Sequence, residues 1–186
     1  MKRKITIMCV SAALLGAFGA SAQEMALSTN LAGYANLGTM NLEASYAFAR
    51  HWSVNAGMKF NPFSYDSKEN IKMQNKQRLY SVGARFWPWH IYSGWWLAGK
   101  MQYQEFNTGG IVSKETSEGD RIGSGITGGY SYMLNPHFNF EFGVGLWAGY
   151  ERFTRYECPV CGSVTDQGEK IFVLPNDLIL SLTYVF

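Results

Sequence analysis

Apolar and polar residues alternate along most of the chain from Ala26 to Phe186. Around position 141, for example, Phe140 and Phe142 flank Glu141. A period of two places successive side chains on opposite faces and is typical of β-strands. The alternation predicts eight strands, at residues 27–37, 40–48, 52–60, 80–86, 95–104, 121–130, 138–151 and 172–186.

The links between these segments alternate in length. Short links fall at residues 49–51, 88–93 and 135–137. Long polar links fall at residues 61–77, 107–120 and 157–168, and a tight link at Gly38-Thr39 belongs to the same end. This arrangement is typical of outer-membrane proteins. The expected fold is all-β: an eight-stranded antiparallel up-and-down transmembrane β-barrel with short periplasmic turns and longer extracellular loops.

The face opposite the apolar one carries four acidic and four basic residues. These are Glu43, Lys59, Arg85, Lys100, Arg121, Glu141, Glu151 and Asp177. A soluble barrel would expose this face, whereas a membrane barrel would enclose it. Because eight strands leave room only for side chains, the enclosed charges are expected to form a salt-bridged network that fills the lumen. A proton or ion relay is the alternative role for the same charges.

Aromatic residues favour the membrane alternative. Five of the six Trp lie beside the short links: Trp52, Trp87, Trp89, Trp95 and Trp96. A second group lies near the long links: Tyr80, Tyr103, Phe106, Tyr150, Phe153 and Tyr156. Indole rings prefer the interface between lipid and water, and a tilted strand of about 9–11 residues crosses a bilayer. The pattern therefore predicts two aromatic girdles around a membrane span.

The N-terminus has the order of a secretory signal peptide. Lys2, Arg3 and Lys4 precede an apolar stretch that ends in Ala20-Ser21-Ala22. We therefore expect a signal peptide at residues 1–22 and a barrel domain at residues 23–186. Without those 22 residues, 13 basic residues face 14 acidic ones, for a net charge of −1. A binder of nucleic acid, which needs a cationic surface, is excluded on this balance.

The C-terminal strand ends in a regular apolar series. Its members are Leu178, Leu180, Leu182, Tyr184 and Phe186, and Phe172 and Leu174 are expected to share their face. A terminal Phe preceded by this series resembles the signature that the bacterial outer-membrane barrel assembly machinery recognises. The expected location is therefore the bacterial outer membrane after Sec export, with membrane lipid and the assembly machinery as partners.

Ordered short motifs across the mature chain resemble the DUF3575 family of Bacteroidota outer-membrane proteins. They include Thr29-Asn30-Leu31, Arg50-His51-Trp52-Ser53-Val54, Asn61-Pro62-Phe63, Arg85-Phe86-Trp87, Phe140-Glu141-Phe142-Gly143-Val144-Gly145 and Tyr184-Val185-Phe186. The third motif departs from the family pattern, which more often has Trp in place of Phe63. The resemblance implies an outer-membrane barrel and supplies no catalytic residues.

Enzymatic chemistry has weak support in the sequence. Some eight-stranded outer-membrane barrels are lipid-modifying hydrolases or acyltransferases, which need a base near a nucleophile at the outer leaflet. His51, His90 and His137 all fall at the short-link end, which is the opposite side. We expect no enzyme and no cofactor, with a lipid-modifying enzyme as the alternative.

Two features of the long links complete the prediction. Cys158 and Cys161 are separated by two residues, which in an oxidising compartment favours a small loop disulfide over a redox motif or half of a zinc site. The links also carry mixed charges and aromatics. Because polar loops on a rigid scaffold commonly bind partners, we expect a structural or surface-interaction role, with an extracellular or surface-assembly protein as the partner.

Overall fold

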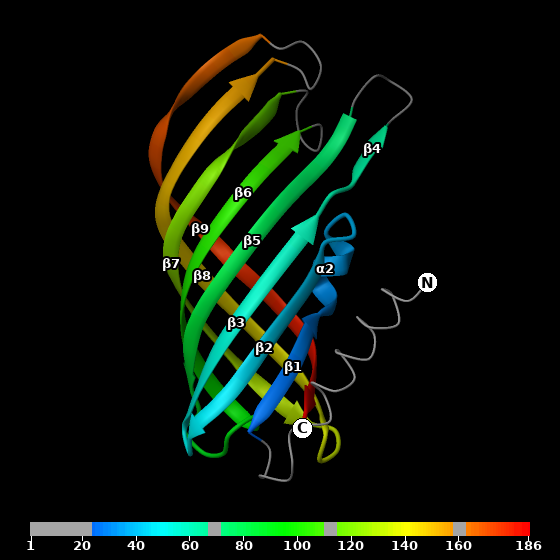
Figure 1. The fold of residues 1–186 in the computed structure, drawn as a ribbon, viewed down its shortest axis with the longest axis vertical. Helices are drawn as coiled ribbons and strands as arrows, with labels where there is room; N and C mark the ends of the chain where they lie inside the picture. Colours follow the sequence, from blue (N-terminus) through cyan, green and yellow to red (C-terminus); the bar gives the residue numbers. More distant parts are fainter. Residues whose placement is uncertain (1–23, 67–71, 110–114, 158–162) are drawn as a thin grey trace, which may run out of the picture.

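The computed structural model describes residues 24–66, 72–109, 115–157 and 163–186 (Figure 1). The predicted signal peptide and both predicted disulfide cysteines lie outside these residues. The strands are β1 Met25–Asn30, β2 Met40–Ala49, β3 Trp52–Asn61, β4 Ser64–Asp66, β5 Lys72–Phe86, β6 Gly94–Gly109, β7 Thr116–Met133, β8 Phe138–Tyr156 and β9 Val164–Val185. One short helix, α2 Leu31–Ala35, follows β1.

Eight of the strands form a closed antiparallel ring. The order of neighbours is β3-β2-β1-β9-β8-β7-β6-β5-β4, and pairing of β3 with β5 closes the circle. The three-residue β4 pairs only with β5 and lies outside the ring. The predicted all-β, eight-stranded antiparallel fold is confirmed as a barrel-like ring. Among the described residues, no helix is long and apolar enough to cross a membrane.

The first strand is shorter than predicted. The sequence predicts a strand at residues 27–37, but β1 ends at Asn30 and the chain enters α2. The Asn30 side chain accepts a hydrogen bond from the N–H of Ala32 and so caps the helix. Leu37 and Gly38 then adopt positive φ angles of 49° and 75°, which turn the chain into β2. This local capping ends the alternation.

The strands on the other side of the ring are longer than predicted. Segments expected as long polar links belong to strands, because β6 continues to Gly109, β8 continues to Tyr156 and β9 begins at Val164. Polar side chains pair across these extensions: Gln74 donates to Asn107, which in turn donates to Glu118. We call this part of β5–β9, at residues 72–77, 107–109, 116–120, 152–156 and 164–170, the polar extension. It rises beyond the ends of β1–β3 (Figure 1).

The faces of β9 change near Pro175. Phe172 and Leu174 were expected to share a face with Leu178, yet Phe172 is buried while Val173 is 68% exposed. The register with β8 shifts here, because Val144 pairs with Leu178 and Leu146 pairs with Pro175. One extra residue in β9 reverses the alternation, so the expectation for Phe172 and Leu174 was wrong.

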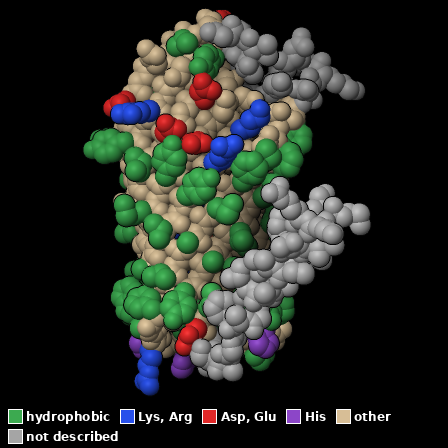
Figure 2. Space-filling model, viewed as in Figure 1, with side chains coloured by type: hydrophobic (Ala, Val, Ile, Leu, Met, Phe, Trp, Pro, Cys, Tyr) green, Lys and Arg blue, Asp and Glu red, His purple; other side chains and the backbone are tan. Residues whose placement is uncertain are grey.

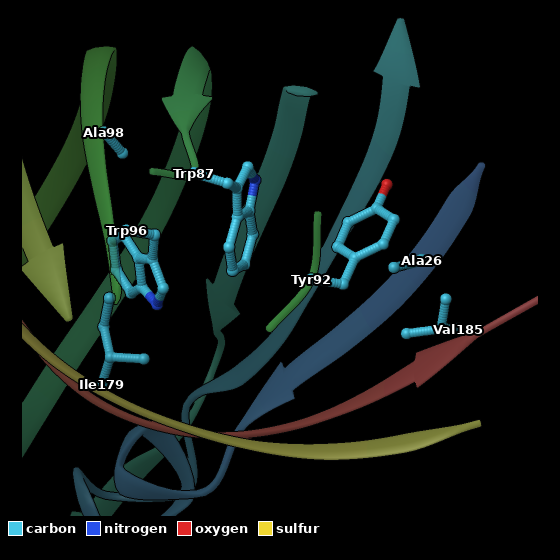
Figure 3. Packing of buried hydrophobic residues seen from close by; sticks show 7 residues of the cluster. All are labelled: Ala26, Trp87, Tyr92, Trp96, Ala98, Ile179 and Val185. Atoms are coloured by element: carbon cyan, nitrogen blue, oxygen red, sulfur yellow. The ribbon is translucent and has the colours of Figure 1, made fainter. Parts of the chain in front are cut away.

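A small apolar core lies inside the ring near the short links (Figure 3). It comprises Ala26, Trp87, Tyr92, Trp96, Ala98, Ile179 and Val185. The edge of the Trp87 ring faces the Tyr92 ring at 5.7 Å between centroids. This core closes the lumen at one end and places the charged residues beside it.

Candidate functional site

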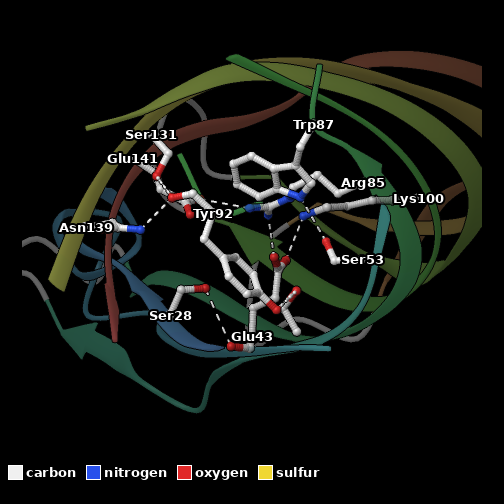
Figure 4. A network of polar contacts seen from close by, with 11 residues as sticks. Ser28, Glu43, Ser53, Arg85, Trp87, Tyr92, Lys100, Ser131, Asn139 and Glu141 are labelled. Carbon is white, nitrogen blue, oxygen red and sulfur yellow. Dashed lines mark hydrogen bonds and ion pairs between the residues drawn. The ribbon is translucent and has the colours of Figure 1, made fainter. Parts of the chain in front are cut away.

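Four charged side chains from four strands meet inside the ring (Figure 4). Arg85 on β5 donates to Glu141 on β8 at 2.9 Å and to Glu43 on β2 at 2.6 Å. Lys100 on β6 donates to the other oxygen of Glu43 at 2.7 Å. We call these four residues the ion cluster. Two cations face two carboxylates, so the charges balance, as burial in a low dielectric requires.

Indole rings cover the Arg85 guanidinium. Its central carbon lies 4.3 Å from the centroid of the Trp96 ring and 5.5 Å from that of Trp87. Cation–π contacts of this kind are favourable, most of all when water is excluded. Trp87 is itself held by its N–H, which donates to Ser53 Oγ at 3.1 Å. The guanidinium therefore binds two carboxylates and packs against two indoles.

The link between β5 and β6 folds back into the lumen. Tyr92 has a φ of 59° and Gly94 a φ of 81°, which allow the reversal. The Tyr92 carbonyl accepts hydrogen bonds from Ser131 at 3.0 Å and from Asn139 at 2.6 Å. Its phenol donates to the carbonyl of Glu24 at 3.1 Å, and burial raises the pKa of this phenol. Tyr92 was not among the predicted site residues; the one signal in the sequence was a link of six residues where a hairpin needs two.

A second group of charges lies toward the polar extension. Arg121 on β7 donates from Nε to Glu151 on β8, and Lys170 on β9 lies 3.3 Å from the other oxygen of Glu151. The Arg121 guanidinium lies 3.8 Å from the centroid of the Phe106 ring. Phe106 is 4% exposed, so its expected place in an outer girdle was wrong. Lys170 was not among the predicted lumen charges.

Of the two remaining predicted lumen charges, Lys59 and Asp177, the structure describes the side chain of Lys59 alone. Lys59 lines the narrow space around the ion cluster, whose volume is about 40 Å³. The side chain of Asp177 lies outside the part of the chain that the structure describes. Since one water needs roughly 10–15 Å³ of cavity volume, the space around the ion cluster admits only a few waters. The arrangement can hold the strands together and obstruct the lumen.

The predicted girdle of Trp divides into two sets. Trp52, Trp89 and Trp95 are exposed by 44%, 59% and 55% on the outside of the ring. Trp87 and Trp96 are exposed by 0% and 3%, so their assignment to the girdle was wrong. They lie inside, where the Arg85 guanidinium packs against both rings and Ser53 accepts a hydrogen bond from the N–H of Trp87.

The C-terminal series and the histidines lie at the short-link end. Leu178, Tyr184 and Phe186 are exposed, whereas Leu180 and Leu182 are half-buried. A ring nitrogen of His51 lies 2.8 Å from the Trp87 carbonyl, and one of His137 lies 3.0 Å from the Val185 carbonyl. His90 lies in the link between β5 and β6. The imidazoles of His51 and His137 thus connect their turns to neighbouring parts of the ring.

Metal binding has no visible cluster of ligands in the described ranges. Within residues 24–66, 72–109, 115–157 and 163–186, no group of three or more His, Cys, Asp and Glu side chains is arranged to hold an ion. Cys158 and Cys161 fall outside these ranges.

Comparison with known proteins gives one result. Searches of curated proteins and of solved structures found no match. The family model described as "Protein of unknown function (DUF3575)" matches residues 5–186, which is nearly the whole chain. The chain belongs to the DUF3575 family.

Proposed function

We propose that the protein is an integral β-barrel of the bacterial outer membrane. Its lumen is filled by side chains, and its role is structural or depends on surface interactions at the long-loop end. The assembly machinery for outer-membrane barrels inserts it after export. The ion cluster has the task of holding the strands of the filled barrel together.

The observation that carries this proposal is an apolar belt around the outside of the ring. On β6 the outward side chains from Trp95 to Tyr103 include Leu97 and Met101, exposed by 54% and 66%. The other strands contribute similar residues: Leu42, Tyr46, Val54, Met58, Tyr80, Val82, Ile122, Ile126, Tyr130, Phe142, Val144, Leu146, Tyr150, Ile171, Val173 and Leu178. We call this surface the outer belt.

Charged residues mark the upper edge of the outer belt. Arg152 on β8 binds Glu169 on β9 at 2.7 Å, and Arg78 on β5 lies 3.9 Å from Glu105 on β6. Figure 2 shows charged side chains gathered above the apolar ones, with histidines near the lower end. Between Trp95 and the level of Glu105, the strand has about the length that a tilted strand needs to cross a bilayer.

The alternative of a soluble barrel conflicts with this surface. Soluble monomers rarely expose contiguous apolar patches larger than a few hundred Å². Here exposed apolar side chains lie on seven of the eight strands of the ring, namely β2, β3 and β5–β9, while the salt-bridged charges of the ion cluster face inward. A barrel in lipid accounts for both faces, because its outer face contacts hydrocarbon and its charged groups are enclosed in the lumen.

The polar extension supports a role at the cell surface. It carries exposed ion pairs and cross-strand hydrogen bonds, such as that from Tyr156 to Glu118 at 2.7 Å. This hydrogen bond raises the pKa of the Tyr156 phenol. A rigid sheet above the membrane would present the long loops to a protein partner.

Membrane fractionation tests the location. We expect the mature chain in the outer-membrane fraction, resistant to extraction with carbonate, and a different gel mobility for boiled and unboiled samples. The purified protein should also give no steady current in planar bilayers, because side chains fill the lumen. A mature chain that stays dissolved and monomeric without detergent would refute the proposal, and a stable channel would refute the filled lumen.

A further inference from the structure

Side chains fill the lumen at the level of the ion cluster and leave a chamber above it. Its volume is about 350 Å³, within the range of small-molecule sites. Every strand of the ring except β2 contributes to its wall, together with α2. The chamber shares Lys59 and Leu79 with the narrow space around the ion cluster, so the two are adjacent.

One side of the chamber is polar and cationic. Its charged lining residues are Lys59 and Arg121, and none of the described residues that line it is an Asp or a Glu. Gln77 and Gln104 lie beside them and bind each other at 2.7 Å. Arg121 uses Nε to bind Glu151, whereas a guanidinium carries five N–H donors. The polar wall therefore suits an anionic group with several acceptor oxygens.

The other side of the chamber is apolar. Leu174, Pro175 and Leu178 on β9 form it with Trp147 on β8. An apolar groove also runs over the outer face of β6–β9, where Met101, Ile126 and Leu146 are exposed by 61–66%. Trp147, Pro175 and Leu178 line both the chamber and this groove. The wall between the lumen and the outer belt is thus one residue thick here.

The ladder that joins β1 to β9 has only five residue pairs. Pairing of β1 with β9 ends where Asn30 meets Ser181. The Asn30 side chain extends the ladder by one step, since it donates to the Leu178 carbonyl at 3.0 Å and accepts from the Leu180 N–H at 3.1 Å. Beyond that step, β9 has α2 as its neighbour in place of a strand. We call this boundary between β9 and α2 the seam; among the described residues no backbone ladder crosses it, so it separates more easily than a paired edge.

We propose that the chamber binds a single-chain amphiphile with an anionic head, such as a fatty acid. The head binds Arg121 and Lys59, and the chain passes the seam between β9 and α2 into the apolar groove. Charge complementarity selects the head, and the shared walls give the chain its path. The position of the chain in lipid rests on the proposed membrane location, whereas the position of the head depends only on the chamber.

Photocrosslinking of the full barrel in phosphatidylcholine nanodiscs tests this site. The probe is a dodecanoate that carries a diazirine on its chain, and modified peptides are mapped by mass spectrometry. We expect adducts concentrated on the β8 and β9 segments around Trp147 and Leu174. Excess dodecanoate should compete, whereas dodecanol should compete about tenfold less well because it lacks the charged head.

Variants separate the site from the fold. Replacing both Arg121→Gln and Lys59→Gln should weaken labelling about tenfold or more, and Leu174→Trp should block it by filling the chamber. Arg152→Gln is the matched control, since Arg152 pairs with Glu169 on the exposed surface. Each variant is first checked for insertion by its gel mobility.

Three outcomes would overturn the inference. They are adducts spread evenly over the outer belt, equal competition by dodecanol, and unchanged labelling of an inserted Leu174→Trp barrel. Competition by acetate as strong as that by dodecanoate would show that a free anion occupies the chamber, which would also overturn it. A barrel that inserts yet binds nothing refutes the site alone, whereas failure to insert refutes the proposed function.

Discussion

Arg85 is the residue on which the ion cluster depends, because it alone binds both Glu43 and Glu141. Replacing it with Met keeps much of the volume but leaves Glu141, which is 1% exposed, without its cation. Breaking a buried pair in this way typically costs about 3–5 kcal/mol. We expect Arg85→Met to lower the free energy of unfolding by about that amount, measured from urea titrations followed by gel mobility.

Two comparisons make the Arg85 prediction specific. Adding Glu141→Gln to Arg85→Met removes the stranded charge, so the double variant should recover part of the lost stability. Arg152→Gln breaks an exposed pair and should cost about 1 kcal/mol or less. Equal losses for Arg85→Met and Arg152→Gln would contradict a stabilising role for the ion cluster.

Alternation was a better guide to single residues than aromatic preference. Alternation with Trp95 and Leu97 already placed Trp96 on the inner face, but the affinity of indole for membrane interfaces led to its assignment to the girdle. Glu43, Arg85, Lys100 and Glu141 were found because alternation alone assigned them inward. Which cation binds which carboxylate depends on ring closure and on the stagger between strands, and neither is visible in a single sequence.

At the scale of elements, Asn30 joins the end of β1, the start of α2 and the edge of β9. Its Oδ1 accepts from the N–H groups of Ala32 and Leu180, and its Nδ2 donates to the Leu178 carbonyl. We expect Asn30→Ala to reduce stability by about 1–2 kcal/mol through loss of the helix cap and of the link to β9.

Asn30→Asp provides the matched comparison. Aspartate still accepts the two N–H bonds but cannot donate to the Leu178 carbonyl. Its loss of stability should therefore be smaller than that of Asn30→Ala in the same urea titration. If the two variants were equally destabilised, acceptance by Oδ1 would not be the stabilising contact.

The reversal of faces in β9 gives a labelling prediction. In a background with Cys158→Ser and Cys161→Ser, single cysteines are placed at Ile171, Phe172 and Val173. Ile171 and Val173 are exposed by 72% and 68%, whereas Phe172 is 6% exposed. Ile171 pairs with Tyr150 near the upper edge of the outer belt, so we expect a small membrane-permeant thiol reagent to modify positions 171 and 173 much faster than position 172. Faster modification of position 172 than of positions 171 and 173 would contradict the reversal of faces. It would mean that the alternation predicted from the sequence continues past Pro175.

The lengths of the elements were predicted poorly for a physical reason. Strands were recognised where one face is apolar, which is true only within the outer belt. In the polar extension both faces are polar, and pairs such as Gln74 with Asn107 replace apolar contacts between strands. Alternation of apolar and polar residues carries no signal there, so those stretches of β5–β9 were taken for loops.

The whole molecule offers a test of which solvent surrounds it. Ile126 lies at the middle of the outer belt and Tyr150 lies near its upper edge beside Arg152, and the two are equally exposed, by 66% and 67%. On a surface in water, Arg at either position would change stability by about 0.5 kcal/mol or less. In a bilayer, Arg costs about 2–4 kcal/mol at the midplane and about 0–1 kcal/mol near the interface.

We therefore expect Ile126→Arg to destabilise the protein in vesicles by a few kcal/mol more than Tyr150→Arg, as measured by reversible unfolding in urea. Phe60 lies on β3 close to Arg78. The substitution Phe60→Arg should therefore also cost little stability. Equal and small effects of Ile126→Arg and Tyr150→Arg would mean that water bathes the outer belt. Because the two side chains are equally exposed, the two substitutions differ in their depth in the bilayer. The difference between their losses of unfolding free energy therefore reports that depth.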